Sequence, residues 1–246
     1  MNEDFYTINR MRAVTISREY GSGGGEIASR LAERLGWQLI DHAIVERVAS
    51  EIGTSTQEAE VHDEHAEGVL ARALNSILYL YPATMVSTPP EAFLSDDDYR
   101  DVLNRVVRAA ATRGHVVIVG RASQVLLAQQ RDILHVRIVA AFEQRVAYVM
   151  RREGLDQAAA QSRIRAKDHD RARYLEREYH CRPGDAHLYD IVLNTSSLDL
   201  ERAVEVICLT LQQKASWLST RTDETGPAKG LSHYPGQPKD FHPTLR

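Results

Sequence analysis

The stretch from Val14 to Asp41 reads VTISREYGSGGGEIASRLAERLGWQLID, and it sets the class of fold. A short run of β-branched and apolar residues leads into a cluster of glycines, and apolar residues then recur every three or four positions up to Leu35. This order predicts a buried strand, a glycine-rich loop and an amphipathic helix. Gly36 stands where helices commonly end, and Trp37 to Ile40 has the composition of a second strand. The stretch therefore predicts the start of a parallel α/β sheet.

The glycine cluster has the composition of a phosphate-binding loop. Glycines let backbone N–H groups converge on an anion without side-chain clashes, and the start of a helix adds unpaired N–H groups and positive potential. Arg18, just ahead of the loop, could donate a fork of hydrogen bonds to phosphate oxygens. The expected nucleotide-binding residues are Gly21, Ser22, Gly23, Gly24, Gly25 and Glu26.

The loop does not match the Walker A pattern G-x-x-x-x-G-K-[ST], because it contains no lysine and no Ser or Thr after one. Gly23 to Ala28 also fits G-x-G-x-x-A, and Asp41 ends the second strand, as in dinucleotide-binding proteins. A glycine-rich turn without any ligand is a further interpretation. The loop alone therefore leaves a mononucleotide site, a dinucleotide site and a structural turn as alternatives.

Downstream, apolar runs predict three more strands over 115–119, 133–140 and 191–193, separated by helical patterns. A closing helix is expected over 200–211. We expect one domain over 11–215, with a helical insert near 55–113 and an arginine-rich segment near 151–180. Residues 217–246 are rich in Gly, Pro, Thr and Lys without periodicity, so a disordered tail is expected there.

Composition excludes several classes of protein. The chain has 30 Lys and Arg against 34 Asp and Glu, a net charge of −4, so a large basic surface for nucleic acid is not expected. Two cysteines make no disulfide framework, and no apolar run approaches the ~20 residues of a membrane span. The histidines at 62 and 65 lack further ligands at a suitable spacing, so no protein metal site is expected. A cytoplasmic protein without membrane partners is the expectation; oligomeric state stays open.

A resemblance to a known family enters at the second strand. Residues 35–47, LGWQLIDHAIVER, look like the corresponding stretch of bacterial cytidylate kinases, and residues 16–24 resemble the S-R-x-x-G-S-G-G loop of the cytidylate kinase-like branch. Gly120-Arg121 is similar to the G-R after the third strand of those kinases. Residues 166–173 resemble their lid segment A-R-D-x-x-D-x-x-R, with one residue fewer and lysine for the first arginine. The resemblance covers about 11–212 and is poor over 43–113.

The resemblance implies a P-loop NTPase-type three-layer fold with a five-stranded parallel sheet, a helical insert and an arginine-rich lid. It implies ATP and Mg²⁺ as cofactors, nucleotides as substrates, and transfer of the γ-phosphoryl group to CMP or a similar small acceptor. Phosphoryl transfer needs positioned cations and exclusion of water. The expected catalytic residues are Arg18, Asp41, Arg171 and Arg173, and the expected acceptor-binding residues are Arg47, Arg121 and Asp170.

Other interpretations remain at this point. The missing lysine and hydroxyl also fit a nucleotide-binding sensor that has lost catalysis, and G-x-G-x-x-A fits a dinucleotide-dependent oxidoreductase. Acidic residues are interleaved with the lid arginines, so this segment could be a solvated charged helix. Asp41 could cap the helix that follows it, which is compatible with a role in catalysis.

Overall fold

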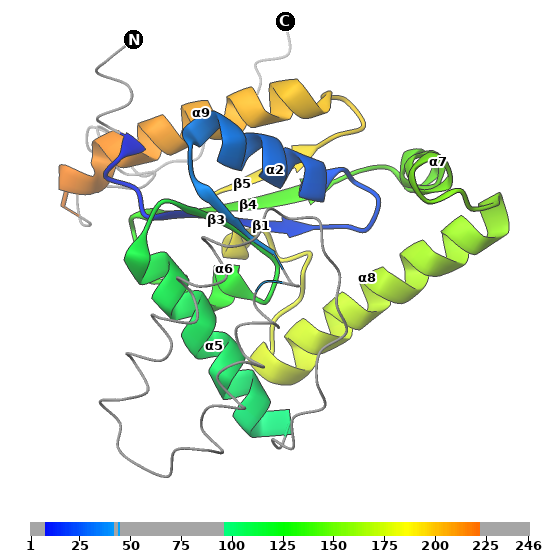
Figure 1. Cartoon of the computed structure of the whole chain (residues 1–246), viewed down its shortest axis with the longest axis horizontal. Helices are drawn as coiled ribbons and strands as arrows, with labels where there is room; N and C mark the ends of the chain where they lie inside the picture. The colour runs from blue at the N-terminus through cyan, green and yellow to red at the C-terminus, as the bar shows by residue number, and fades with distance from the viewer. Residues whose placement is uncertain (1–7, 42–43, 45–95, 222–246) are drawn as a thin grey trace, which may run out of the picture.

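A five-stranded sheet forms the centre of the computed structural model, which describes residues 8–41, 44 and 96–221. Neighbouring strands pair in parallel in the order β2-β3-β1-β4-β5 (Figure 1). The strands are β1 (Ala13–Arg18), β2 (Gln38–Ile40), β3 (Val116–Val119), β4 (Ile133–Val139) and β5 (Ile191–Asn194). The predicted α/β class and the five parallel strands are confirmed.

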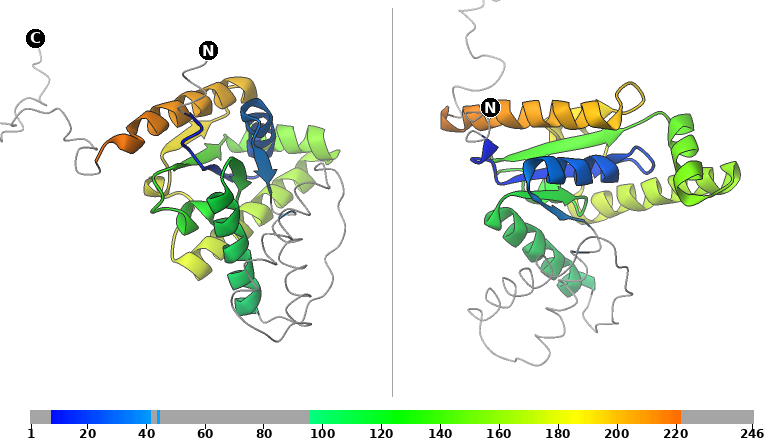
Figure 2. Two further views of the ribbon diagram at one scale, coloured as in Figure 1. Left: turned by 60° about the vertical axis from the view of Figure 1, so that its left-hand side comes forward. Right: turned by 45° about the horizontal axis from the view of Figure 1, so that its top comes forward.

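Helices cover both faces of the sheet (Figure 2). One face carries α2 (Gly24–Leu35) and α9 (Leu200–Ser216), and the other carries α5 (Asp96–Arg113) and the short α6 (Ser123–Leu126). The remaining helical segments are α7 (Phe142–Glu153), α8 (Gln157–Tyr179), η1 (Ala186–Leu188) and η2 (Trp217–Ser219). The result is a three-layer arrangement with a separate α7–α8 hairpin beyond the sheet.

Side chains alternate between the two faces along each strand, so two cores form. Val14 and Ile16 of β1 pack with α2 and α9, whereas Ala13 packs with α5. The α9 helix continues past its predicted end at position 211, because Leu211 and Ala215 both remain buried in the first core.

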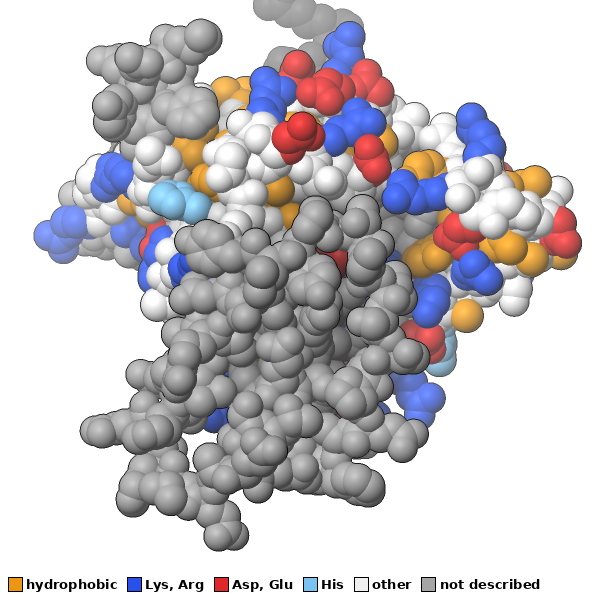
Figure 3. All heavy atoms as spheres, viewed as in Figure 1, with side chains coloured by type: hydrophobic (Ala, Val, Ile, Leu, Met, Phe, Trp, Pro, Cys, Tyr) orange, Lys and Arg blue, Asp and Glu red, His pale blue; other side chains and the backbone are white. Residues whose placement is uncertain are grey.

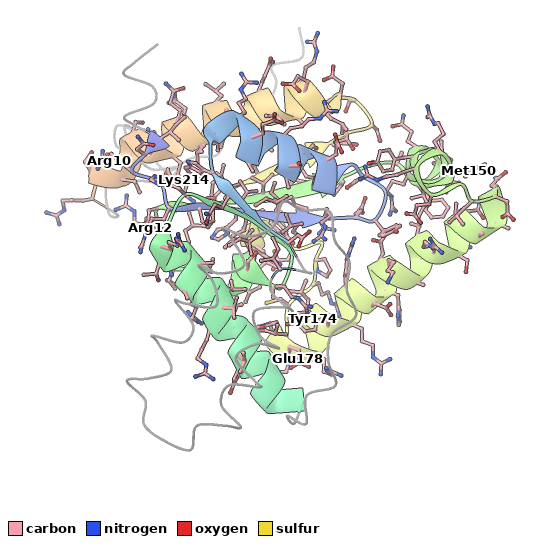
Figure 4. The ribbon with its side chains drawn as sticks, in the orientation of Figure 1. Arg10, Arg12, Met150, Tyr174, Glu178 and Lys214 are labelled. Atoms are coloured by element: carbon pink, nitrogen blue, oxygen red, sulfur yellow. The ribbon has the colours of Figure 1, made fainter. Side chains whose placement is uncertain are left out.

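The α7–α8 hairpin has a small core of its own, made by Val146, Val149, Ala160 and Ile164. Tyr20 of the glycine loop packs against this core. The far end of α8 is attached to α5, where Arg100 donates to Glu178 at 2.6 Å and the Tyr179 hydroxyl lies 2.8 Å from Asn104 Oδ1. Figure 4 shows Tyr174 and Glu178 at this end of α8 and Met150 on α7. The α8 helix is therefore held at both ends.

Candidate active site

A cleft of about 750 Å³ lies at the carboxyl ends of β1, β3 and β4, with α8 on its other side. Ligands of open α/β sheets bind at this edge of the strands. Four predicted site residues line it: Arg18, Arg121, Asp170 and Arg171. The structure thus brings together residues that lie up to 153 positions apart, since Arg171 Nη1 donates to the Arg18 carbonyl oxygen at 3.1 Å.

A smaller hollow of about 200 Å³ lies at the glycine loop, beside the cleft. The helix α2 begins at Gly24 without a side-chain cap, so the N–H groups of its first turn are left for a ligand. The hollow is lined by Gly21, Gly23, Gly24, Gly25 and Glu26, with residues of α7 opposite. Four residues line both spaces, namely Arg18, Glu19, Tyr20 and Arg171. The two spaces therefore adjoin.

The loop has a shape that requires glycine at two positions. Gly21 and Gly23 have φ angles of 81° and 77°, in the left-handed region. A Cβ on Gly23 would lie 2.6 Å from Leu200 Cδ2, and one on Gly21 would lie 2.9 Å from Val149 Cγ2. The path of the backbone is thus fixed by close packing against α7 and the start of α9.

The two side chains of the loop already have partners. Ser22 is buried, and its hydroxyl lies 2.9 Å from the Glu19 carbonyl oxygen and 3.3 Å from that of Ile138. Glu26 pairs with Arg30 at 3.1 Å and with Arg152 at 3.5 Å. An anion in the hollow would therefore meet mainly backbone N–H groups.

Arg18 extends from the loop to the turn after β3. A Cβ on Gly24 would lie 2.7 Å from Arg18 Cβ, and a Cβ on Gly120 would lie 2.4 Å from Arg18 Nη1. Burial lowers the pKa of Arg18 to about 10, helped by the charge of Arg171 and opposed by that of Asp41. The side chain stays protonated at neutral pH, and a bound anion would relieve the crowding of positive charge.

The turn after β3 holds three successive residues in the left-handed region: Gly120 (φ 79°), Arg121 (φ 54°) and Ala122 (φ 50°). Each non-glycine residue there costs on the order of 1–3 kcal/mol, and such strain is concentrated at functional sites. The N–H of Ser123 donates to the Gly120 carbonyl at 3.1 Å and closes the turn. The turn brings Arg121 to the wall of the cleft.

Asp168 and Arg171 on α8 join the lid to the loop. One oxygen of Asp168 accepts from the Tyr20 backbone N–H at 2.7 Å, and the other accepts from Arg145 at 2.5 Å. Arg171 lies 3.8 Å from Asp168 and 5.4 Å from the centre of the Tyr20 ring. The pKa of Arg171 is lowered, mainly because the guanidinium is buried. A purely solvated charged helix does not account for these contacts.

Asp170 and Arg173 lie on another face of α8, because positions 168 and 171 share a helical face that 170 and 173 do not. The Asp170 side chain is 71% exposed at the rim of the cleft. Arg173 is exposed and is not among the residues that line the cleft. Arg173 therefore does not meet the other site residues here, whereas Asp170 meets them only at the rim of the cleft.

Asp41 directly follows β2, and its Oδ1 accepts from the Ile44 N–H at 3.1 Å, the geometry of a helix N-cap. Its charge also raises the pKa of Arg18, so it acts on the site electrostatically as well. Arg47, the histidines at 62 and 65, and positions 55–95 of the predicted insert lie outside the described residues.

Sequence reasoning missed two arginines that the structure places beside the site. Arg145 is buried, pairs with Asp168 and lies 3.6 Å from Glu19. Arg137, on β4, lines the cleft. The signal for Arg137 was a charged residue between Val136 and Ile138, inside an apolar strand.

The rest of the described surface shows no further site of an obvious kind. On the face in Figure 3, Lys and Arg side chains are interspersed with Asp and Glu over the described elements. No helix in the described part of the chain is long and apolar enough to cross a membrane. The same residues contain no group of three or more His, Cys, Asp or Glu suited to a metal ion.

Comparisons with known proteins agree with the fold. The model of the cytidylate kinase-like family matches residues 13–197. The cytidylate kinase of Ignicoccus hospitalis is 26% identical over 198 residues, which cover 80% of this chain and 97% of that protein. A crystal structure of an uncharacterized protein from Eubacterium ventriosum has a TM-score of 0.60 at 21% identity, covering 81% of this chain and 98% of that one.

A further match is partial. The uronate isomerase of Corynebacterium glutamicum is 30% identical over 115 residues, or 47% of this chain. The matched region is 21% of that protein, so this chain spans about a fifth of its length.

Proposed function

The chain belongs to the cytidylate kinase-like family, and from this premise we propose that it is an ATP-dependent phosphotransferase acting on CMP or a similar small acceptor. The observation that carries the proposal is the continuity of two spaces, a glycine-lined hollow and a nucleotide-sized cleft, with Arg18 and Arg171 in both. A donor phosphate in the first would face an acceptor in the second. Such substrates belong to the cytoplasm, which is the location we propose.

The donor side uses the loop. The β- and γ-phosphates of ATP would lie in the hollow, where glycines leave room and the start of α2 supplies N–H groups. If Gly23 is aligned with the last glycine of the Walker pattern, Gly24 occupies the lysine position and Arg18 that of the first glycine. A side chain at 24 would collide with Arg18, which supports the proposal that the two positions have exchanged roles. Arg18 would supply the missing cation.

Magnesium would be held by Asp41, directly or through water, because Mg²⁺ prefers carboxylate and water oxygens. Asp41 is close enough to Arg18 to raise its pKa, so its carboxylate lies near the arginine that lines both spaces. The ion would neutralise charge on the phosphate oxygens. The Ser22 hydroxyl is a poor ligand, since it is buried against two backbone carbonyls.

The acceptor side uses the cleft, whose volume of about 750 Å³ suits a small nucleotide. An acceptor phosphate is already a nucleophile, so the residues must position it rather than deprotonate it. Arg121, Asp170 and Arg171 line the cleft. Arg47, which lies outside the described residues, is proposed to bind the acceptor as well. We further propose that α8 excludes water, which would otherwise hydrolyse ATP.

An ADP-release assay with Mg²⁺ and ATP tests this function against CMP, dCMP, UMP and AMP. We expect turnover with at least one acceptor, CMP being the fastest, and little ADP release without an acceptor. Absence of turnover with all four would contradict the proposal.

A nucleotide sensor without catalysis is the second candidate, favoured by the absence of a lysine in the loop. ATP binding in calorimetry, together with no turnover in the same preparation, would support it. Binding of NAD(P) in the same titration would instead revive the dinucleotide interpretation.

A further inference from the structure

A row of cross-strand pairs between β1 and β4 becomes more polar toward the cleft. The pairs are Ala13–Ile133, Thr15–His135 and Ser17–Arg137. Thr15 Oγ1 lies 2.8 Å from His135 Nδ1, and Arg137 Nη1 donates to Ser17 Oγ at 3.1 Å. Both Thr15 and His135 are buried, and burial lowers the pKa of His135 to about 4, so this pair is neutral. Arg137 is therefore the one charged residue of this row, and it lies at the edge of the cleft.

Tyr189 completes the support of Arg137. Its hydroxyl lies 3.2 Å from Ser17 Oγ and 3.1 Å from the Pro183 carbonyl oxygen. Arg137 Nη1 lies 3.5 Å from the same hydroxyl, and its guanidinium carbon lies 5.6 Å from the centre of the Tyr189 ring. The guanidinium is thus held by two hydroxyls and an aromatic ring, which fix its plane without neutralising it.

Two neighbouring arginines, Arg145 on α7 and Arg171 on α8, differ in this respect. Arg145 pairs with Asp168 at 2.5 Å, and Arg171 lies 3.8 Å from the same carboxylate. Among the residues whose side chains the structure describes, no carboxylate lies within ion-pair distance of Arg137, and its partners Ser17 and Tyr189 are neutral. A cation so placed keeps its charge for an anion that enters the cleft.

The strand order gives this charge a defined position. Because β1 lies between β3 and β4, Arg137 on β4 and Arg121 after β3 flank Arg18 at the end of β1. All three line the same cleft. An anionic group in front of β1 would therefore meet cations from three neighbouring strands.

We propose that Arg137 binds an anionic oxygen of the acceptor, and that Ser17 and Tyr189 are positioning residues that orient its guanidinium. The proposal rests on the proposed phosphotransferase function and adds a residue that determines acceptor affinity. A lysine at 137 would keep the charge but lose the fork and the stacking on Tyr189, so it would not be equivalent.

The experiment compares Arg137→Ala, Arg137→Lys and Tyr189→Phe with the wild-type protein, using the acceptor that the wild type turns over best. The matched control is Arg151→Ala, which removes an exposed arginine on α7. We expect Arg137→Ala to raise the KM for the acceptor roughly 10- to 100-fold, the range for a charge-assisted hydrogen bond, and to leave the KM for ATP within about twofold. Tyr189→Phe should give a rise of about three- to tenfold.

Added guanidinium ion should restore part of the acceptor affinity of Arg137→Ala and should not affect Arg151→Ala. An unchanged acceptor KM in Arg137→Ala, or an equal rise for both substrates, would overturn the proposal. If Arg137→Ala does not fold, Arg137→Lys and Tyr189→Phe are tested in the same way. A higher KM for the acceptor with an unchanged KM for ATP supports the proposal, and an unchanged acceptor KM overturns it.

If the wild type turns over no acceptor, the proposed function fails but Arg137 can still be tested. Calorimetry with CMP and a non-hydrolysable ATP analogue then compares wild type with Arg137→Ala. Weaker CMP binding by the variant supports the role of Arg137. Equal binding by the two proteins, or binding by neither, contradicts it.

Discussion

The glycine loop and the lid helix face the same site, but they are built to meet an anion in different ways. The loop offers backbone N–H groups, and its two side chains, Ser22 and Glu26, are bonded elsewhere. The lid offers the side chains of α8, and helical geometry decides which of them face inward. Folding should therefore be sensitive to an atom added at the tightly packed glycines of the loop, and activity to the identity of a few lid residues.

The largest effect on folding should come from a single methyl group in the loop. Gly23→Ala places a Cβ in the left-handed region and 2.6 Å from Leu200 Cδ2, so we expect it to cost about 2–3 kcal/mol of unfolding free energy. Gly25→Ala is the control, because a Cβ there meets nothing within 4 Å. Denaturant unfolding should show Gly25→Ala within about 1 kcal/mol of wild type. Equal losses in the two variants would mean that the loop is not shaped as described.

A smaller effect, confined to activity, should separate two arginines of the lid. Arg171→Met removes the donor to the Arg18 carbonyl and a cation at the junction of the two spaces, so we expect kcat to fall roughly 10- to 50-fold. Arg173→Met removes an exposed arginine two positions away and should leave kcat within about twofold. A larger loss in Arg173→Met than in Arg171→Met would show that α8 turns in the working enzyme.

The structure of the glycine loop could be predicted from the sequence, and that of the lid helix only in part. The strand, loop and helix around Gly21 to Gly25 follow from local patterns of apolar residues and glycines, and the structure has them at the predicted positions. The lid segment was predicted as helical, but its inward face was not. Of the predicted residues of α8, Arg171 contacts the backbone of Arg18, whereas Asp170 is largely exposed and Arg173 does not line the cleft. Asp168, which was not predicted, accepts from the Tyr20 N–H, since the rotation of a helix depends on tertiary packing.

Arg137 and Arg18 show the same limit. The sequence around Arg137 does not show where its side chain lies. Its partners are distant in sequence, because Ser17 is on the neighbouring strand and Tyr189 follows η1. Arg18 was predicted as a phosphate ligand, but the sequence does not show that a side chain at position 24 would clash with it, because this depends on the path of the loop in space.

The central claim is that Arg18 provides the cation that a lysine provides in the Walker pattern. Phosphoryl transfer from labelled ATP to the best acceptor should be measured for wild type, Arg18→Gly, and Arg18→Gly combined with Gly24→Lys. We expect Arg18→Gly to lower kcat about 100- to 1000-fold, as loss of one transition-state donor does, and the double variant to regain at least about tenfold over it. A wild-type rate in Arg18→Gly would contradict the claim.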